Sequence, residues 1–261
     1  MAHSSPQPRP GGPVPSARPA LRVVSYNIHH GADVAERPSL DRIGDVLDRL
    51  EPDVIVLPEV DRFWRRSRFV DQPAWFSERL GMQAEYAPAL HRPAERPGGP
   101  DREYGVLLLS RLPLSEVRRI PLPRTGDCEP RTLITARADL EGRSVTVAGA
   151  HLEHAEATLR AQQATAVLEA LPEQGDPVVL AGDFNDSARS PALRTLTSRL
   201  QDSWVAAGVG PRCTYRGCFL DPRRLRIDYV LTEGMHCVRA EVHRPSPPPS
   251  DHRPLVVDLE I

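Results

Sequence analysis

Short apolar runs alternate with an amphipathic segment near the start of the chain. Residues 21–27 and 54–57 are rich in β-branched residues and predict strands. Between them Ser39 is a suitable N-cap, and apolar residues then recur at helical spacing at Leu40, Ile43, Leu47 and Leu50. A strand, a helix and a second strand, with polar residues after each strand, are the pattern of a layered α/β domain.

The same reasoning divides the remainder of the chain into short elements. It predicts helices at 73–80, 155–171 and 191–200, and strands at 84–87, 104–110, 115–122, 131–140, 144–150, 178–181, 226–231, 237–243 and 255–261. Residues 93–100 are expected to form a loop, and Glu141-Gly142-Arg143 is typical of a hairpin turn. Because no internal repeat or second linker is visible, residues 21–261 are predicted to form a single domain.

Composition narrows the class of protein. Residues 1–20 contain six prolines and no apolar run, which indicates a disordered Pro-rich tail and neither a signal peptide nor a transmembrane helix. An apolar share of 40% supports a sizeable core, and the formal net charge of -2 disfavours a protein that lives on duplex DNA. The four cysteines lack the CxxC spacing of a zinc site, so we expect reduced thiols and a cytoplasmic location.

Polar side chains recur where predicted strands end. They are Asn27, Glu59, His151, Asp183, Asn185, Asp228, Asp251 and His252. Asp183 and Asn185 are two residues apart, so in extended chain they project to the same side. Asp228 lies among apolar residues and needs a buried partner, for which His252 is a candidate. Each residue alone could cap a turn or be a satisfied core group, but the full set at strand ends indicates an active site.

In this order, these residues resemble the endonuclease/exonuclease/phosphatase superfamily, which includes deoxyribonuclease-I-like nucleases, inositol polyphosphate phosphatases and neutral sphingomyelinases. The resemblance covers the chain from about residue 21 onward and is carried by the following segments: Tyr26-Asn27, Pro58-Glu59-Val60, Ala150-His151-Leu152, Gly182-Asp183-Phe184-Asn185, Arg226-Ile227-Asp228-Tyr229 and Ser250-Asp251-His252. It implies a four-layer α/β sandwich, in which two mixed, largely antiparallel sheets pack face to face with helices outside. It also implies a metal-dependent hydrolase that cleaves phosphoester bonds.

The resemblance also implies a role for each matching residue. Glu59 would be the main Mg²⁺ ligand (with Mn²⁺ as an alternative ion), and Asn27 and Asp251 would complete the metal surroundings. Asp183 would orient or deprotonate the attacking water, and Asn185 would hold that water. His252, held by Asp228, would donate to the phosphate, and His151 and Arg131 would contact other phosphate oxygens.

Two departures from the family pattern affect these expectations. Pro58 stands where the family usually has Gln before the metal-binding Glu, so the local geometry at Glu59 is open. Ile28-His29 follows Asn27 where abasic-site enzymes carry an acid, which favours a phosphatase, phosphodiesterase or general nuclease over abasic-site repair.

Arginine-rich segments flank two of the motifs. Arg65 belongs to an arginine and aromatic run at 62–68, and Arg226 follows Arg223 and Arg224 before Asp228; Arg65, Arg131 and Arg226 are the candidate substrate contacts. Histidines at 29, 30, 151 and 154 could suggest zinc, but a dedicated zinc site is not expected, because the 151–154 pair begins at a strand end.

The substrate class stays open at this point. A phosphorylated substrate is expected as partner, whether nucleic acid, nucleotide, inositol phosphate or lipid head group, and the sequence does not choose between diester and monoester. A catalytically silent phosphate-binding module on the same fold is the alternative of a different class, disfavoured because the complete set of acids is retained. A membrane-bound lipid phosphodiesterase lacks support, since no amphipathic basic helix is visible.

Overall fold

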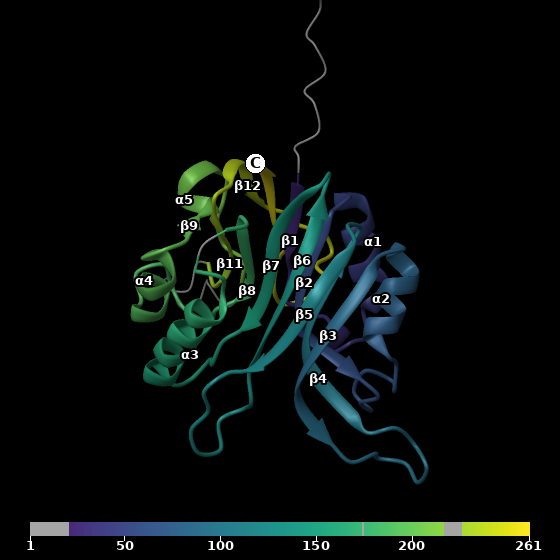
Figure 1. Ribbon diagram of the computed structural model, residues 1–261. Helices are drawn as coiled ribbons and strands as arrows, with labels where there is room; N and C mark the ends of the chain where they lie inside the picture. The colour runs from purple at the N-terminus through teal and green to yellow at the C-terminus, as the bar shows by residue number, and fades with distance from the viewer. Residues whose placement is uncertain (1–20, 174, 217–225) are drawn as a thin grey trace, which may run out of the picture.

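Two β-sheets form the centre of the molecule (Figure 1). The computed structural model describes residues 21–173, 175–216 and 226–261, so the expected tail at 1–20 and Arg223 and Arg224 lie outside the described residues. In sheet order, the seven-stranded sheet contains β10 (Gly208–Val209), β12 (His236–Val242), β13 (Leu255–Glu260), β1 (Leu21–Ser25), β2 (Val54–Arg62), β4 (Arg102–Ser110) and β3 (Gln83–Arg92). The six-stranded sheet contains β5 (Leu114–Pro121), β6 (Thr132–Leu140), β7 (Arg143–His151), β8 (Val178–Asp183), β11 (Asp228–Glu233) and β9 (Gln201–Asp202).

Both sheets are mixed and mainly antiparallel. Among the described strands, β1 and β2, β7 and β8, and β10 and β12 pair in parallel, and the other neighbours pair in antiparallel. Helices α1 (Leu40–Leu50) and α2 (Gln72–Leu80) cover the outer face of the seven-stranded sheet, and α3 (Ala157–Ala170) and α4 (Pro191–Thr197) cover that of the six-stranded sheet (Figure 1). The four-layer sandwich expected from the family resemblance is thereby confirmed.

Alternation along the strands produces three layers of core. Val23 and Val56 face the six-stranded sheet, whereas their neighbours Val24 and Leu57 pack toward α1 and α2. The two sheets approach closely, because a Cβ added to Gly149 would lie 2.9 Å from Cγ1 of Val56. Period-two alternation with apolar residues on both sides is what a strand buried between a second sheet and a helix layer requires.

Strand β2 differs from the prediction in a way that matters for the site. The apolar run predicts a strand that ends at Leu57, but β2 continues to Arg62. The register jumps from Leu57 opposite Leu107 to Val60 opposite Gly105, which is a β-bulge, and Glu59 within it has a φ of 61°. A bulge redirects side chains and bends the strand, so Glu59 leaves the regular alternation of the sheet.

Several small elements were not predicted. They are the 3-10 turn η1 (His29–Gly31), the helix α5 (Ser203–Ala207) and the two-residue strands β9 and β10. Elements this short carry too few residues for a periodic apolar pattern, so tertiary packing decides them. The loop predicted at 93–100 is present between β3 and β4, and the turn at 141–142 joins β6 and β7.

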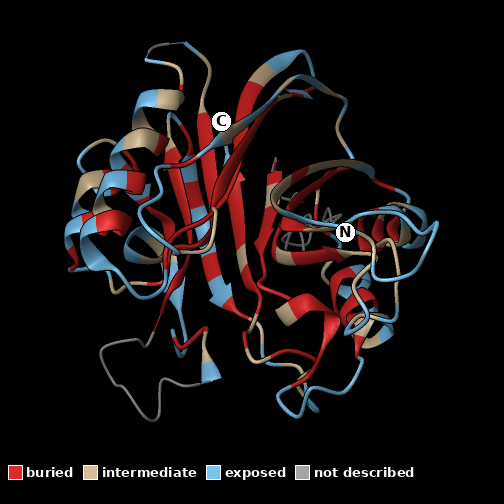
Figure 2. Cartoon of the chain, turned by 90° about the horizontal axis from the view of Figure 1, so that it is seen from below, coloured by how far each residue is buried: buried red, intermediate tan, exposed pale blue. Residues whose placement is uncertain are grey.

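Two loops extend from one end of the sandwich. One joins β3 to β4 and the other joins β5 to β6, and both lie at the lower end of the molecule in Figure 1. Seen from that end in Figure 2, buried strands run through the centre and exposed residues occupy the outer helices and loops.

Two expectations from composition concern membrane spans and the state of the cysteines. No helix among the described residues is both long and apolar enough to cross a bilayer. Cys128 and Cys237 are free, but Cys213 is disulfide-bonded, so the expectation of reduced thiols is wrong for that residue. Because disulfides persist mainly in oxidising compartments, Cys213 gives no support to a cytoplasmic location, which stays a prediction.

Candidate active site

Strand pairing places three of the candidate residues in one row of the six-stranded sheet. His151 ends β7 and Asp183 ends β8, and the parallel register puts these two residues opposite each other. Asp228 begins the antiparallel strand β11 and is the register partner of Asp183 on its other side. The carboxyl ends of parallel strands and the amino end of an antiparallel neighbour share one edge of a sheet, so topology brings these three side chains together.

The other sheet contributes its residues to the same end of the molecule. Asn27 follows β1, Glu59 lies in the bulge of β2, and Asp251 and His252 precede β13, which is antiparallel to β1. Oγ of Ser250 donates to the backbone carbonyl of Asn27 at 2.9 Å and so fixes the segment before β13 to the end of β1.

Gly182 is required for the close approach of β7 and β8. Its φ is 148°, and an added Cβ would lie 1.8 Å from the carbonyl oxygen of Ala150. A side chain cannot be accommodated against backbone at that distance, and the conformation itself favours glycine. The glycine therefore lets Asp183 leave the strand directly beside His151.

Asp183 lies at the centre of the cluster. Its Oδ1 accepts from the backbone NH of Asn185 at 2.9 Å, and its Oδ2 accepts from Nδ2 of Asn27 at 2.9 Å. The same Oδ2 lies 3.7 Å from Nε2 of His252 and 3.8 Å from Nε2 of His151, distances too long for direct hydrogen bonds. Burial, followed by the charge of Asp228, raises the pKa of Asp183 to about 7.

His252 and Asp228 form a buried pair. Nδ1 of His252 donates to Oδ2 of Asp228 at 2.9 Å, which leaves Nε2 directed toward Asp183. Burial alone would lower the pKa of His252, but the charges of Asp228 and Asp183 and the hydrogen bond raise the pKa well above its ordinary value. The ring of Tyr215 packs against His252 with centroids 4.9 Å apart. His252 is therefore an imidazolium at neutral pH, with one proton available to a substrate oxygen.

His151 is held in the neutral state. Nη1 of Arg131 donates to Nδ1 of His151 at 3.0 Å, because a guanidinium has no acceptor. Burial, then the charges of Arg131 and His252, lower the pKa of His151 well below its ordinary value. Nδ2 of Asn185 lies 3.0 Å from Nε2 of His151 and 3.0 Å from the carbonyl oxygen of Leu152.

The donor set fits a hard divalent cation. Glu59 and Asp251 are half-buried carboxylates, and Nδ2 of Asn27 joins Glu59 to Asp183. Oδ1 of Asp228 is buried without a hydrogen-bond partner in the described chain, as expected of an oxygen that awaits a ligand. Carboxylate oxygens are the ligands that Mg²⁺ and Mn²⁺ prefer.

Asn27 makes a different contact from the predicted metal coordination. Its Oδ1 accepts from the backbone NH of His29 at 3.0 Å, so the amide nitrogen faces the carboxylates. Nδ2 donates to Glu59 at 2.9 Å and to Asp183 at 2.9 Å. In this orientation Asn27 joins the two acidic groups, and its coordination of a cation stays a prediction.

The three candidate arginines are placed differently from one another. Arg131 is buried in the cluster and also pairs with Glu129 at 2.7 Å. Arg226 lies outside the cluster, because its two Nη atoms donate to the two carboxylate oxygens of Asp202 at 2.9 and 2.6 Å. That buried pair occupies the guanidinium fork, so the structure disfavours a substrate contact by Arg226. Arg65 is exposed after β2, and its substrate contact stays a prediction.

Sequence reasoning did not single out several residues that shape the site. Arg66 stacks on Tyr104 and pairs with the buried Asp61 at 2.8 Å, and its pKa is influenced by the charge of Glu59. Oγ1 of Thr214 accepts from the backbone NH of Asp228 at 3.2 Å. Arg66 was within a basic run already noted, whereas nothing in the local pattern at Thr214 signals its contact with residues further along the chain.

Comparisons with known proteins agree with this arrangement. The chain matches the model of the Endonuclease/Exonuclease/phosphatase family over residues 24–252. It is 28% identical to an endonuclease/exonuclease/phosphatase from Beutenbergia cavernae DSM 12333, with a TM-score of 0.76 over 92% of this chain and 71% of that chain. A mannosyl-6-phosphatase of Bacteroides thetaiotaomicron VPI-5482 is 19% identical, with a TM-score of 0.73 over 92% of this chain and 100% of that chain, which is a likeness of fold. Protein cwh43 of Schizosaccharomyces pombe (strain 972 / ATCC 24843) is 31% identical over 161 residues, which are 60% of this chain but 15% of that protein.

Proposed function

Because the chain belongs to the endonuclease/exonuclease/phosphatase family, we propose that it is a Mg²⁺-dependent phosphoesterase that hydrolyses a phosphodiester or a phosphomonoester by direct attack of water. One observation carries the proposal. Oδ2 of Asp183 lies between two histidine Nε2 atoms, 3.7 Å and 3.8 Å away. The gaps are too long for direct bonds, and a carboxylate between two imidazoles has the chemistry to orient a water against a phosphate.

Each group has a separate task in this reaction. Asp183 accepts a proton from the attacking water, a role for which a carboxylate with a pKa near neutrality is suited. His252 directs its Nε2 proton at a phosphate oxygen, and Asp228 holds the imidazolium in that orientation through Nδ1. His151, whose Nδ1 accepts from Arg131, would contact another phosphate oxygen.

A divalent cation would be held by Glu59 and Asp251, with Asp183 nearby. When bound, it would supply positive charge that offsets the charge developing on the phosphate oxygens. Asn27 keeps Glu59 and Asp183 at a defined separation through its two amide hydrogens. Pro58, which replaces the usual family Gln, is buried within β2, and its backbone carbonyl accepts from the NH of Ile28 at 3.4 Å.

Two loops near this centre bear on the choice of substrate. The loops between β3 and β4 and between β5 and β6 extend from the same end, so they are placed to select the group attached to the phosphate. We propose a phosphorylated small molecule or a nucleic acid segment as substrate, with the exposed Arg65, in the run that follows Glu59, as a basic contact. Mannosyl 6-phosphate enters the test because one structural neighbour is named for it.

The experiment measures hydrolysis with and without metal. Bis-p-nitrophenyl phosphate and p-nitrophenyl phosphate distinguish diesterase from monoesterase activity. A panel of nucleic acids, nucleotides, inositol phosphates, sugar phosphates and phospholipid head groups then addresses specificity. We expect activity that requires Mg²⁺ or Mn²⁺ and is abolished in Asp183→Asn.

A matched control separates chemistry from folding. Asp186→Asn makes the same chemical change three residues away, where the carboxylate pairs with Arg160 at 2.8 Å. We expect this variant to retain activity. Hydrolysis that survives excess chelator, or equal rates in Asp183→Asn and the unaltered protein, would contradict the proposal. Binding of phosphate ligands without any hydrolysis would favour the silent binding module.

A further inference from the structure

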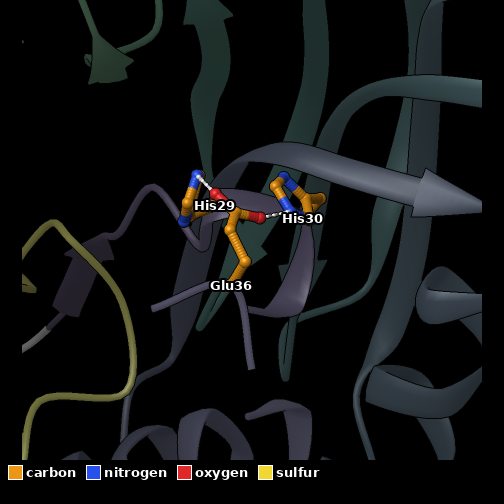
Figure 3. Close-up of side chains that lie close together, drawn as sticks. All are labelled: His29, His30 and Glu36. Carbon is orange, nitrogen blue, oxygen red and sulfur yellow. Dashed lines mark hydrogen bonds and ion pairs between the residues drawn. The ribbon is translucent and has the colours of Figure 1, made fainter. Parts of the chain in front are cut away.

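Three side chains beside the candidate active site face one another without a role in the proposed reaction. His29 and His30 lie in η1, and Glu36 lies in the following loop; Figure 3 shows both imidazoles directed at the Glu36 carboxylate. Nε2 of His29 is 3.3 Å from Oε1 of Glu36, and Nε2 of His30 is 3.1 Å from Oε2. The ligand atoms of the three residues all lie within 4.8 Å of one another.

Each of the two nitrogen–oxygen separations, one to each oxygen of Glu36, is close to the edge length of a tetrahedral metal site. With metal–nitrogen and metal–oxygen bonds of about 2.0–2.1 Å, two ligands at a tetrahedral angle are ~3.3 Å apart. The observed nitrogen–oxygen distances are 3.3 and 3.1 Å. Two imidazoles and one carboxylate are a recurring zinc ligand set, and three protein ligands leave the fourth position open to water or substrate.

The backbone adopts uncommon conformations at all three ligand positions. His29, His30 and Glu36 have φ values of 47°, 45° and 56°, in the left-handed region that favours glycine. Two consecutive histidines in this region place both rings on one side of the chain, with ring centroids 4.4 Å apart. Such strain persists only where the surrounding structure enforces it, and it concentrates at functional sites.

The surrounding structure does enforce this conformation. The backbone carbonyl of His30 accepts from Nε2 of Gln72 at 2.7 Å. The loop that carries Glu36 folds around Asp33, which is buried and accepts from the backbone NH groups of Ala35 and Arg37 at 2.9 and 3.1 Å. Glu36 itself is largely exposed, so the site is preorganised yet open to solvent.

The second ring nitrogen of His29, which would not coordinate the cation, also bears on the site. Nδ1 of His29 is buried and has no hydrogen-bond partner in the described part of the chain, and Oδ1 of Asp251 lies 3.9 Å from it. Metal-bound histidines commonly direct their second ring nitrogen toward a carboxylate, which fixes the tautomer that leaves Nε2 free to coordinate. At 3.9 Å no hydrogen bond joins His29 to Asp251, so His29 shares with such histidines only the direction of Nδ1 toward a carboxylate.

We propose that His29, His30 and Glu36 form a second cation site, for a transition metal ion such as Zn²⁺, next to the oxygen-rich centre. Imidazole nitrogen favours zinc and its neighbours in the transition series over Mg²⁺, so the two sites differ in the ion they select. A zinc site was not expected from the sequence, where His29 and His30 were considered together with His151 and His154. The partner that completes the set is Glu36, six residues along the chain from His30.

The test uses the tag-free full-length chain, stripped of metal by a chelator and kept in excess Mg²⁺ to saturate the oxygen-rich centre. Co²⁺ is titrated in, and the visible absorption of tetrahedral cobalt reports binding, followed by displacement with Zn²⁺. We expect a single saturable equivalent with a tetrahedral spectrum. Because the readout is an absorption band, it is independent of whether the protein hydrolyses any phosphoester.

Variants assign the signal to the three residues. Glu36→Gln alters an exposed side chain and should keep the fold, and we expect it to weaken Co²⁺ binding by tenfold or more, at least the ~10-fold seen when even an outer partner of a metal ligand is lost. Glu141→Gln is the matched control, since Glu141 is also exposed with a φ of 53°. Glu59→Gln should leave the cobalt spectrum in place, because Glu59 belongs to the other centre.

His30→Gln provides a second test, accompanied by thermal unfolding of the metal-free protein to verify its fold. The proposal is overturned if the unaltered protein shows no saturable tetrahedral cobalt signal. It is equally overturned if Glu36→Gln binds Co²⁺ as tightly as Glu141→Gln does, or if the signal disappears only in Glu59→Gln.

Discussion

The buried pair of His252 and Asp228 supports a quantitative prediction. Asp228→Asn keeps the shape of the side chain but removes the charge that faces Nδ1 at 2.9 Å. Both side chains are almost completely buried, so water cannot replace the lost interaction. A hydrogen bond to a charged group contributes about 1.5–3 kcal/mol, which corresponds to a fall of about 1–2 units in the pKa of His252.

The assay follows His252 directly. Titration of the imidazole by NMR in the unaltered protein and in Asp228→Asn gives the two pKa values, and hydrolysis of bis-p-nitrophenyl phosphate gives the rates. If His252 donates to the phosphate as an imidazolium, the same 1.5–3 kcal/mol predicts a loss of rate of about 10- to 150-fold. Asp202→Asn is the control, because Asp202 is another buried aspartate of the same sheet that pairs with Arg226.

The outcome that refutes this reasoning is specific. If the pKa of His252 is the same in Asp228→Asn as in the unaltered protein, Asp228 does not stabilise the imidazolium. If Asp202→Asn lowers the rate as much as Asp228→Asn does, the effect arises from general destabilisation of the sheet and not from the pair.

Three further predictions concern stability. The pKa of Asp183 is raised to about 7, so the folded protein binds a proton at Asp183 more tightly than the unfolded chain does. As pH rises from 4 to 7, the unaltered protein should therefore lose stability relative to Asp183→Asn in metal-free denaturant titrations. A stability difference that stays constant with pH would contradict this. Gly182→Ala forces a Cβ to 1.8 Å from the Ala150 carbonyl and should cost about 2 kcal/mol or more, measured as a lower denaturation midpoint. Arg226→Met strands the buried Asp202 and should cost about 3–5 kcal/mol, whereas retained stability would show that the pair contributes little.

The local sequence pattern was sufficient to predict an element where its conformation depends on residues nearby in the chain. The helix predicted from Ser39 was found as Leu40–Leu50, and the strand predicted at 178–181 was found as Val178–Asp183, two residues longer. These segments obey simple periodicity because each packs one defined face, or both faces, against apolar neighbours. The same holds for the hairpin at 141–142, where glycine permits the turn.

Local pattern failed where a distant contact decides the outcome. The bulge at Glu59 arises from pairing with β4, more than forty residues later in the chain, and no feature of the strand itself announces it. Arg226 looked like a substrate contact because it follows other arginines, but Asp202 on the neighbouring strand β9 occupies its guanidinium. A basic run shows where charge is present, and only the fold shows which charge is already paired.

The sequence by itself determined the order of the longer strands and helices and the residue types available to the active site, because these depend on periodicity and on side chains adjacent to apolar runs. Tertiary structure alone decided which of those side chains meet. Asp183 contacts Asn27, 156 residues away, and lies 3.7 Å from His252, since the two sheets bring the ends of β1 and β8 and the starts of β11 and β13 to one end of the molecule. Asn27 faces two carboxylates, and His29 and His30 face Glu36, arrangements that depend on backbone conformations a linear pattern does not encode.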